Sequence, residues 1–194
     1  MSEELGKIEK PEAGEFKGQR KLCFVPLIGV WLNAEGDFAA LYQRYWEEVE
    51  QHLGGLEKRL GTVRRLYHEF LLEGGDQGLR VAKELNIHSG ATVEQRIGQG
   101  ATLELIEDEA ALTEFMDWSR CLSIGLQSKA VFDTIYTAFT EANQRRNQHI
   151  AAQIDTTLQA DEIGILFMRE GHQVQFPEDI QVFYVAPPAL EEIK

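Results

Sequence analysis

Histidine and glutamate side chains follow three apolar stretches of this 194-residue chain. His68 and Glu69 lie near the end of the first stretch. Glu107 closes the second stretch, and His172 comes shortly after the third, in the run "GILFMREGHQV". A carboxylate beside a histidine can activate a water molecule for hydrolysis. If the fold brings these four residues together, we expect a hydrolase-like or metal-dependent site.

Arg146 is the candidate cation for such a site. Residues 128–158 have the pattern of a long helix, whose apolar stripe includes Phe139 and Ala142 and resumes at Ile150. The run "RRN" interrupts this stripe. An arginine that faces a core is costly unless it is paired. Two alternatives follow: Arg146 pairs with the strand-end carboxylates, where it would bind an anion or an oxyanion, or its side chain extends to solvent between helices.

The sequence lacks the motifs that identify a metal, a nucleotide or a serine nucleophile. It contains no HxH, HExxH, GxGxxG, P-loop or GxSxG pattern. The two cysteines, Cys23 and Cys121, lie in apolar segments and form no CxxC, so we expect them to be core thiols. The sequence motifs therefore identify neither a cofactor nor a metal.

Composition limits the partners. A net charge of −13 argues against nucleic acid and anionic membranes, because their phosphates would be repelled. The N-terminal run has no apolar centre typical of a signal peptide, and no apolar run reaches the roughly 20 residues of a membrane helix. We therefore expect a soluble cytoplasmic protein with no nucleic-acid partner and no membrane partner.

The elements that must position these residues alternate along the chain. We expect residues 1–20 to be a flexible N-terminal tail and residues 21–194 to form a single α/β domain. The expected strands cover 21–32, 62–75, 101–108, 162–168 and 179–186. The expected helices cover 37–58, 76–85, the run after 108, and 128–158, with a short helix or turn near 91–100 and a short helix after 186.

This alternation predicts an α/β fold. We expect a mostly parallel sheet of about five strands, with helices on both faces and one long helix before the last two strands. Pro26 predicts a bend or two short strands in the first stretch, and Gly54-Gly55 predicts the end of a helix or a kink. Open parallel sheets bind ligands at the carboxyl ends of their strands, so the site is predicted at that edge.

Helix starts are predicted from capping residues. Asp37, Asp76 and Ser128 stand before apolar-periodic runs, and each is a candidate N-cap. The aromatic-rich run "FAALYQRYWEEVEQHL" in residues 37–58 has two interpretations. It packs in the core, or it forms a homodimer interface, where tyrosine and tryptophan are favoured.

The C-terminal part of the chain contains the run "RRNQHIAAQIDTTLQADEIGILFMREGHQV". This run resembles the closing segment of the TraB/ChaN/erythromycin-esterase-like group, in which an Arg-Asn pair on a long helix precedes a strand that is followed by a small residue and a histidine. The resemblance assigns Arg146 and Asn147 to the pair and His172 to the histidine. "GATLELIED" is similar to a mid-chain strand of the group, which adds Glu107 or Asp108. The group implies an α/β fold and members that are hydrolases, peptidases or haem- and iron-related proteins.

The resemblance also leaves a gap. The group carries a Gly-x-x-His motif after its first strand, and the corresponding run here, "VPLIGVWLN", has no histidine. Two functions therefore stay open. The first is a hydrolase-like or metal-dependent enzyme with its site at the C-terminal strand ends. The second is a non-catalytic small-molecule-binding or protein-interaction module on a degenerate enzyme fold, with a homodimer as one form. The candidate site residues are His172, Arg146, His68, Glu69 and Glu107.

Overall fold

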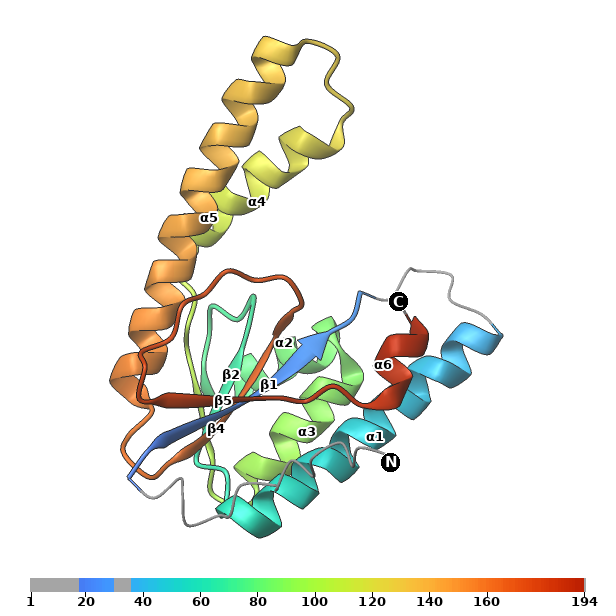
Figure 1. The fold of residues 1–194 in the computed structure, drawn as a ribbon, viewed down its shortest axis with the longest axis vertical. Helices are drawn as coiled ribbons and strands as arrows, with labels where there is room; N and C mark the ends of the chain where they lie inside the picture. The colour runs from blue at the N-terminus through green and yellow to red at the C-terminus, as the bar shows by residue number, and fades with distance from the viewer. Residues whose placement is uncertain (1–17, 30–35, 194) are drawn as a thin grey trace, which may run out of the picture.

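The chain folds around a five-stranded parallel sheet (Figure 1). The computed structural model describes residues 18–29 and 36–193. The sheet order is β3-β2-β4-β1-β5. The strands are β1 (Arg20–Leu27), β2 (Arg65–His68), β3 (Thr102–Glu104), β4 (Ile163–Arg169) and β5 (Ile180–Tyr184). The helices are α1 (Asp37–Leu60), α2 (Gly75–Leu85), α3 (Ile87–Ile97), α4 (Glu109–Ser123), α5 (Lys129–Thr157) and α6 (Pro188–Ile193).

The predicted fold class is confirmed, and every strand pair is parallel. The long helix α5 precedes the last two strands, as expected. Of the predicted N-terminal tail, residues 1–17 lie outside the described residues, and Arg20 already belongs to β1. Within the described part of the chain, no helix combines the length and apolarity that crossing a membrane requires.

Two cores cover the two faces of the sheet. Alternate residues of β4 point to opposite faces, so Ile165 and Phe167 enter one core while Leu166 and Met168 enter the other. The first core is completed by α1, α2, α3 and α6, and the second by the C-terminal half of α5. A central strand buried on both faces explains the continuous apolar run "ILFM".

Of the two alternatives predicted for Pro26, a bend or two short strands, the second is wrong, because Pro26 does not divide β1. The strand is continuous, and Pro26 pairs in register with Met168 of β4. The carbonyl of Phe24 accepts from Val185 on the β5 side, and Pro26 has the same orientation two residues on. Because β5 ends at Tyr184, no strand on that side needs an N–H from Pro26. The Pro26 carbonyl accepts from the Tyr45 hydroxyl at 2.6 Å.

The other corrections concern where elements begin and end. β2 has four residues rather than the predicted 62–75, and β3 has three rather than 101–108, because the chain leaves the sheet before Glu69 and Glu107. The helix α1 runs through Gly54-Gly55 without ending, held by the buried side chain of Leu53, and stops at Gly61. The helix spans 37–60 in place of 37–58.

The predicted capping residues divide into two groups. Ser128 caps α5 as expected, because its hydroxyl accepts from the Val131 N–H. Asp37 and Asp76 were predicted wrongly as caps. They lie in the first turns of α1 and α2, where a carboxylate still interacts favourably with the helix dipole. The residues before these two helices make no side-chain cap bond.

A helical hairpin projects from the sheet (Figure 1). It consists of α4 and the N-terminal half of α5, which pack along each other, with the rings of Phe115 and Phe139 5.5 Å apart. We call residues 116–141 the distal arm; none of them is buried. The apolar stripe of α5 therefore faces the sheet core only in its C-terminal half, and Val131 is 45% exposed.

Candidate functional site

Three charged residues meet at the carboxyl edge of the sheet. Arg146 on α5 donates from Nε to a Glu107 carboxylate oxygen at 2.8 Å and from Nη2 to the other oxygen. The same Nη2 lies 3.4 Å from Glu69 Oε2. Each of the three side chains is at most 1% exposed. We call Arg146, Glu69 and Glu107 the ionic cluster; it realises the alternative in which Arg146 pairs with strand-end carboxylates.

Backbone groups complete the ionic cluster. The Phe70 N–H donates to Glu107 at 3.0 Å, and the Arg169 N–H donates to Glu69 at 2.7 Å. The cluster thereby connects the end of β2, the loop before α4, the end of β4, and α5. Burial raises the pKa of Glu69, against the opposing effect of Arg169 and Arg146. Burial alone would lower the pKa of Arg146, but the carboxylates of Glu107 and Glu69 outweigh it and raise that pKa.

Aromatic rings shield the Arg146 guanidinium from solvent. Its Cζ lies 5.3 Å from the centroid of Phe70 and 4.9 Å from that of Phe115. Phe70 has a φ of 69°, a strained conformation for a bulky residue, and its bond to Glu107 helps to hold it there. Nη1 of Arg146 is buried and has no hydrogen-bond partner among the described residues. In this conformation the carboxylates are paired and enclosed, so a substrate reaches neither of them.

His68 lies next to Glu69 in the chain but contacts a different part of the molecule. Its Nδ1 is 2.7 Å from the Glu69 carbonyl and its Nε2 is 3.0 Å from the Ser89 hydroxyl on α3. Because a carbonyl only accepts, Nδ1 carries the proton, and Nε2 accepts from Ser89 in the neutral ring. Burial lowers the pKa of His68 to about 4. Among the described residues, no hydrogen bond links this imidazole to the charged side chains of the ionic cluster.

His172 lies in the loop between β4 and β5. Its ring contacts Phe24 edge-on, with centroids 4.6 Å apart, and lies near Phe176. Its Nδ1 accepts from the Val174 N–H at 3.3 Å. Burial, and then the charge of Arg169, lower the pKa of His172. Of the five candidate residues, the structure thus joins three in one cluster and places the two histidines elsewhere.

Asp108, which the resemblance offered as an alternative to Glu107, has a local structural role. Its carboxylate accepts from the Ala111 N–H at 2.9 Å and caps α4. An N-cap carboxylate faces the positive end of its helix. The choice between the two acidic residues is therefore clear: Glu107 enters the ionic cluster and Asp108 does not.

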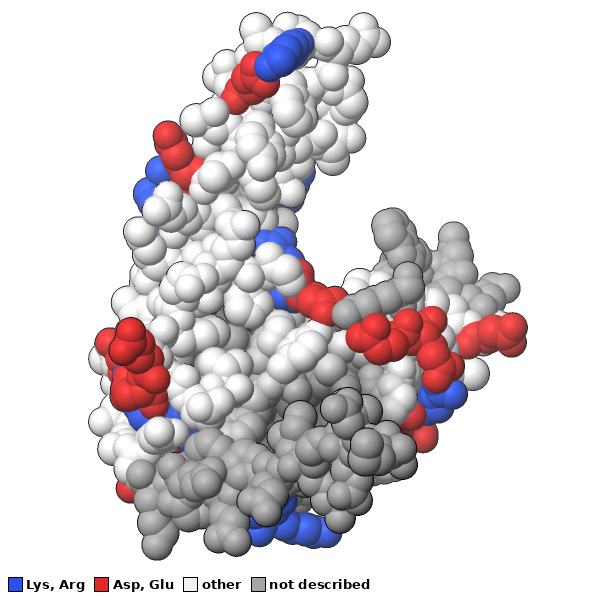
Figure 2. All heavy atoms as spheres, viewed as in Figure 1, with Lys and Arg blue, Asp and Glu red and all other residues white. Residues whose placement is uncertain are grey.

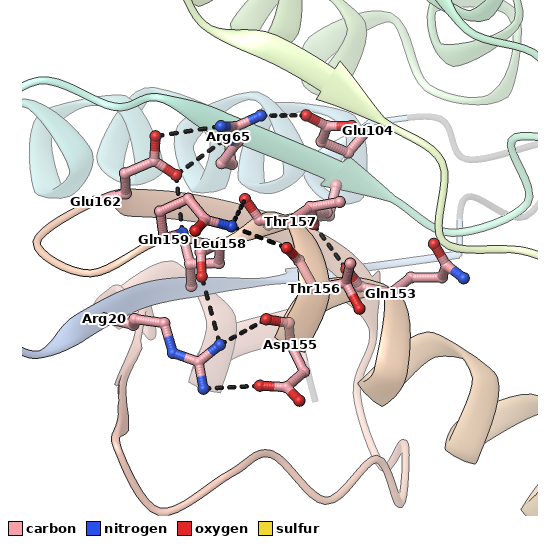
Figure 3. Close-up of polar contacts among 11 residues, drawn as sticks. Arg20, Arg65, Glu104, Gln153, Asp155, Thr156, Thr157, Leu158, Gln159 and Glu162 are labelled. Atoms are coloured by element: carbon pink, nitrogen blue, oxygen red, sulfur yellow. Dashed lines mark hydrogen bonds and ion pairs between the residues drawn. The ribbon is translucent and has the colours of Figure 1, made fainter.

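The opposite end of α5 is fixed at the amino edge of the sheet (Figure 3). Arg20 on β1 donates to the Asp155 carbonyl at 2.7 Å and pairs with its carboxylate at 2.8 Å. The Tyr67 hydroxyl lies 3.0 Å from Thr157 Oγ1. Arg65 joins Glu104 to Glu162 beside this contact (Figure 3). The C-terminal half of α5 is thus held at both edges of the sheet.

A pocket of about 490 Å³, lined mainly by side chains that carry amides, lies between α5 and the β4–β5 loop. We call it the glutamine pocket. Its lining residues are Thr140, Gln144, Asn147, Gln148, Ala151, Gln173 and Gln175. Five of them recur along α5 at spacings of three and four, which places them on one helix face. The other two are two residues apart in the loop, on either side of the buried Val174.

Asn147 is the distinctive residue of this pocket. The residue as a whole is 6% exposed, and its amide forms no hydrogen bond with any residue in the described part of the chain. The amide atoms are not fully enclosed, so they are accessible from the pocket that the residue lines. The neighbouring Arg146 is fixed by the ionic cluster, and this fixes the helix turn that presents Asn147 to the pocket.

The sequence offered only a weak signal for this pocket. Asn147 entered through the resemblance, as part of an Arg-Asn pair, and the four glutamines were not predicted. The spacing of Gln144 and Gln148 places them on one helix face, and that of Gln173 and Gln175 places them on one side of an extended segment. Glutamine is common on exposed faces, so neither pair identifies a site until the fold places them together.

No metal site is visible among the described residues: no three or more His, Cys, Asp or Glu side chains are grouped to hold an ion. Comparisons of the chain with protein-family models, curated proteins and solved structures found no match. The resemblance to the TraB/ChaN/erythromycin-esterase-like group stays a prediction. The fold and the pocket define an α/β protein with an uncharged cavity, lined mainly by side chains that carry amides, beside the carboxyl edge of a parallel sheet.

Proposed function

We propose that this protein binds a small, uncharged polar molecule in the glutamine pocket. The observation that supports this most strongly is Asn147, whose amide is accessible at the wall of a cavity and forms no hydrogen bond with any described residue. A ligand that accepts from and donates to this amide would form hydrogen bonds that contribute about 0.5–1.5 kcal/mol each.

The lining favours a ligand without charge. None of the seven lining residues is charged, so none offers the ion pair that a phosphate or an ammonium group requires. The net charge of −13 further disfavours anions. Each amide side chain supplies both hydrogen-bond donors and acceptors, which suits a molecule rich in hydroxyl or amide groups.

The volume sets the size of the ligand. About 490 Å³ lies in the range of about 300–1,000 Å³ that is typical of small-molecule sites. A monosaccharide, a cyclic polyol or a nucleoside fits these two requirements. None of the lining side chains transfers protons readily near neutral pH, so the pocket by itself supports binding rather than acid–base catalysis.

His172 has a positioning role in this proposal. Its Nδ1 accepts from the Val174 N–H, and Val174 is buried between the two glutamines of the loop. The bond requires an unprotonated Nδ1, and the lowered pKa of His172 favours the neutral ring. The histidine thereby holds Gln173 and Gln175 toward α5, although it does not line the pocket.

The test is a binding screen by isothermal titration calorimetry with glucose, myo-inositol, adenosine and cytidine. Their charged counterparts, glucose 6-phosphate and adenosine monophosphate, serve for comparison. We expect at least one uncharged compound to bind saturably and its phosphorylated form to bind more weakly. Asn147→Leu should weaken binding about tenfold, because a hydrogen bond in a binding site contributes about 0.5–1.5 kcal/mol.

The matched control is Asn143→Leu, one turn earlier on α5 and outside the set of lining residues. It should leave the affinity unchanged. If no uncharged compound binds, or if both asparagine variants weaken binding equally, the proposal is wrong.

A further inference from the structure

We infer that the distal arm is the interface on which a second copy of this chain docks, arm against arm. The first observation is burial. No residue from Met116 to Glu141 is buried, although half of this segment is apolar in sequence. Helices in proteins are stabilised mainly by packing of an apolar face, and this hairpin covers only part of its own.

The uncovered apolar side chains include aromatic ones. Phe132 and Tyr136 are 44% and 53% exposed, and their rings stack with centroids 5.7 Å apart. Val131 on α5, Met116 on α4 and Ile124 in the connecting turn are exposed as well. Phenylalanine, tyrosine and methionine are enriched at the centres of protein interfaces. The surface therefore has the composition of an interface and not that of an ordinary solvent-facing helix.

Charge distinguishes a second copy from other partners. The distal arm holds the acids Asp117, Asp133 and Glu141 and the bases Arg120 and Lys129, which gives it a net charge of −1. Asp117 pairs with Arg120 and Asp133 with Lys129 on the same helix. Of the net charge of −13, the remaining −12 therefore belongs to the rest of the molecule.

This distribution determines how two copies can meet. Two strongly acidic bodies repel each other, whereas two arms of net charge −1 repel each other only weakly. On the face drawn in Figure 2, the arm carries a few charged side chains of both signs, while acidic side chains gather across the hollow from it. Contact through the distal arms keeps the acidic remainders of the two chains apart and covers the apolar surface of both arms.

The size and shape of the distal arm also suit docking of a second copy of this chain. Stable interfaces engage about 20–30 residues on each side, and the distal arm has 26 residues. Two helical hairpins side by side form a four-helix bundle. A two-fold axis between them makes one patch complementary to itself, which is the commonest symmetry of homo-oligomers.

The experiment is sedimentation velocity of the full chain from about 1 to about 100 µM, a range that reports micromolar dissociation constants. We expect a concentration-dependent dimer. Phe132→Asp with Tyr136→Asp should make the protein monomeric across the range, because it places four carboxylates against each other in the two-fold contact. Ile87→Asp changes a still more exposed apolar residue outside the distal arm and should leave the dimer intact.

Amide hydrogen exchange locates the contact independently. We expect residues 116–141 to exchange more slowly at high than at low protein concentration, with α1 unchanged. A protein that stays monomeric at about 100 µM overturns the inference, and so does a dimer that survives the double substitution. A dimer in which α1 is protected instead would assign the interface to the aromatic helix. Binding to the glutamine pocket is measured separately, so either result leaves that proposal to its own test.

Discussion

The two halves of α5 have similar apolar patterns and opposite surroundings. The C-terminal half is held by the ionic cluster at one edge of the sheet and by Arg20 at the other. The N-terminal half packs against α4 and buries no residue before Ala142. One continuous helix thus begins as an exposed surface and ends as part of a core. The glutamine pocket lies in the second half, where the helix cannot shift.

The largest expected effect tests how much the ionic cluster stabilises the C-terminal half of α5 against the sheet. Arg146→Met should lower the free energy of unfolding by about 3–5 kcal/mol, because it leaves the buried carboxylate of Glu107 without its cation, while Arg169 still lies 4.0 Å from Glu69. Arg145→Met is the matched control. Arg145 is exposed and pairs with the exposed Glu114, so its loss should cost at most about 1 kcal/mol. Urea denaturation measures both values, and equal costs would contradict this account of the cluster.

The second largest effect is the pH dependence of the free energy of unfolding. His68 has its pKa lowered to about 4 by burial, so between pH 6.5 and 4 the unfolded chain takes up a proton that the folded protein refuses. The folded state therefore loses up to about 3 kcal/mol of stability as the pH falls through this window.

His68→Gln removes this titration while retaining a donor and an acceptor. The free energy of unfolding of His68→Gln, measured by urea denaturation, should rise relative to that of the wild type as the pH falls from 7 to 4. His52→Gln, at an exposed position of α1, is the control and should follow the wild-type curve. Parallel curves for the wild type and His68→Gln would show that the ring titrates freely in the folded protein.

A smaller effect is expected at the glutamine pocket. Asn147→Leu should change the free energy of unfolding by less than about 0.5 kcal/mol, because the amide forms no hydrogen bond with any described residue that the substitution would break. The same substitution should weaken ligand binding. Asn143→Leu should change stability by less than about 0.5 kcal/mol. If Asn147→Leu destabilises the protein strongly, the amide has a structural partner and the pocket loses its main support.

The smallest expected effect on stability concerns the exposed N-terminal half of α5. Phe132→Asp with Tyr136→Asp should change the unfolding free energy of the body by less than about 0.5 kcal/mol when measured on the monomer at low concentration. Thermal unfolding followed by circular dichroism at about 1 µM provides this value. A loss comparable to that of Arg146→Met would mean that the arm supports the body, and the two halves of α5 would then not differ as described.

The sequence predicts the parts of the fold that depend on local patterns. The apolar run before Arg169 and the cap at Ser128 identify β4 and the start of α5, because burial and capping act over a few residues. The arm could not be predicted in this way. Periodicity shows which face of a helix is apolar, but it does not show what covers that face.

The site was predicted in part for a similar reason. Arg146, Glu69 and Glu107 were expected at the carboxyl edge, and parallel strands do bring them together. His68 and His172 were expected beside them, but His68 is the last residue of β2 and its ring reaches Ser89 on α3, whereas Glu69 lies in the turn that follows and reaches Arg146. The glutamine pocket joins residues about 30 positions apart in the chain that carry no charge, and only the fold reveals it.

The most direct test of the central claim is the side-chain amide signal of Asn147 in an ¹⁵N-labelled sample. The signal is assigned by its disappearance in Asn147→Leu. Titration with the uncharged sugars and nucleosides should move it saturably, together with glutamine side-chain signals, while the amide of Asn143 stays in place. If no uncharged compound moves the Asn147 signal, or if the same compounds bind Asn147→Leu equally well, the glutamine pocket is not the binding site.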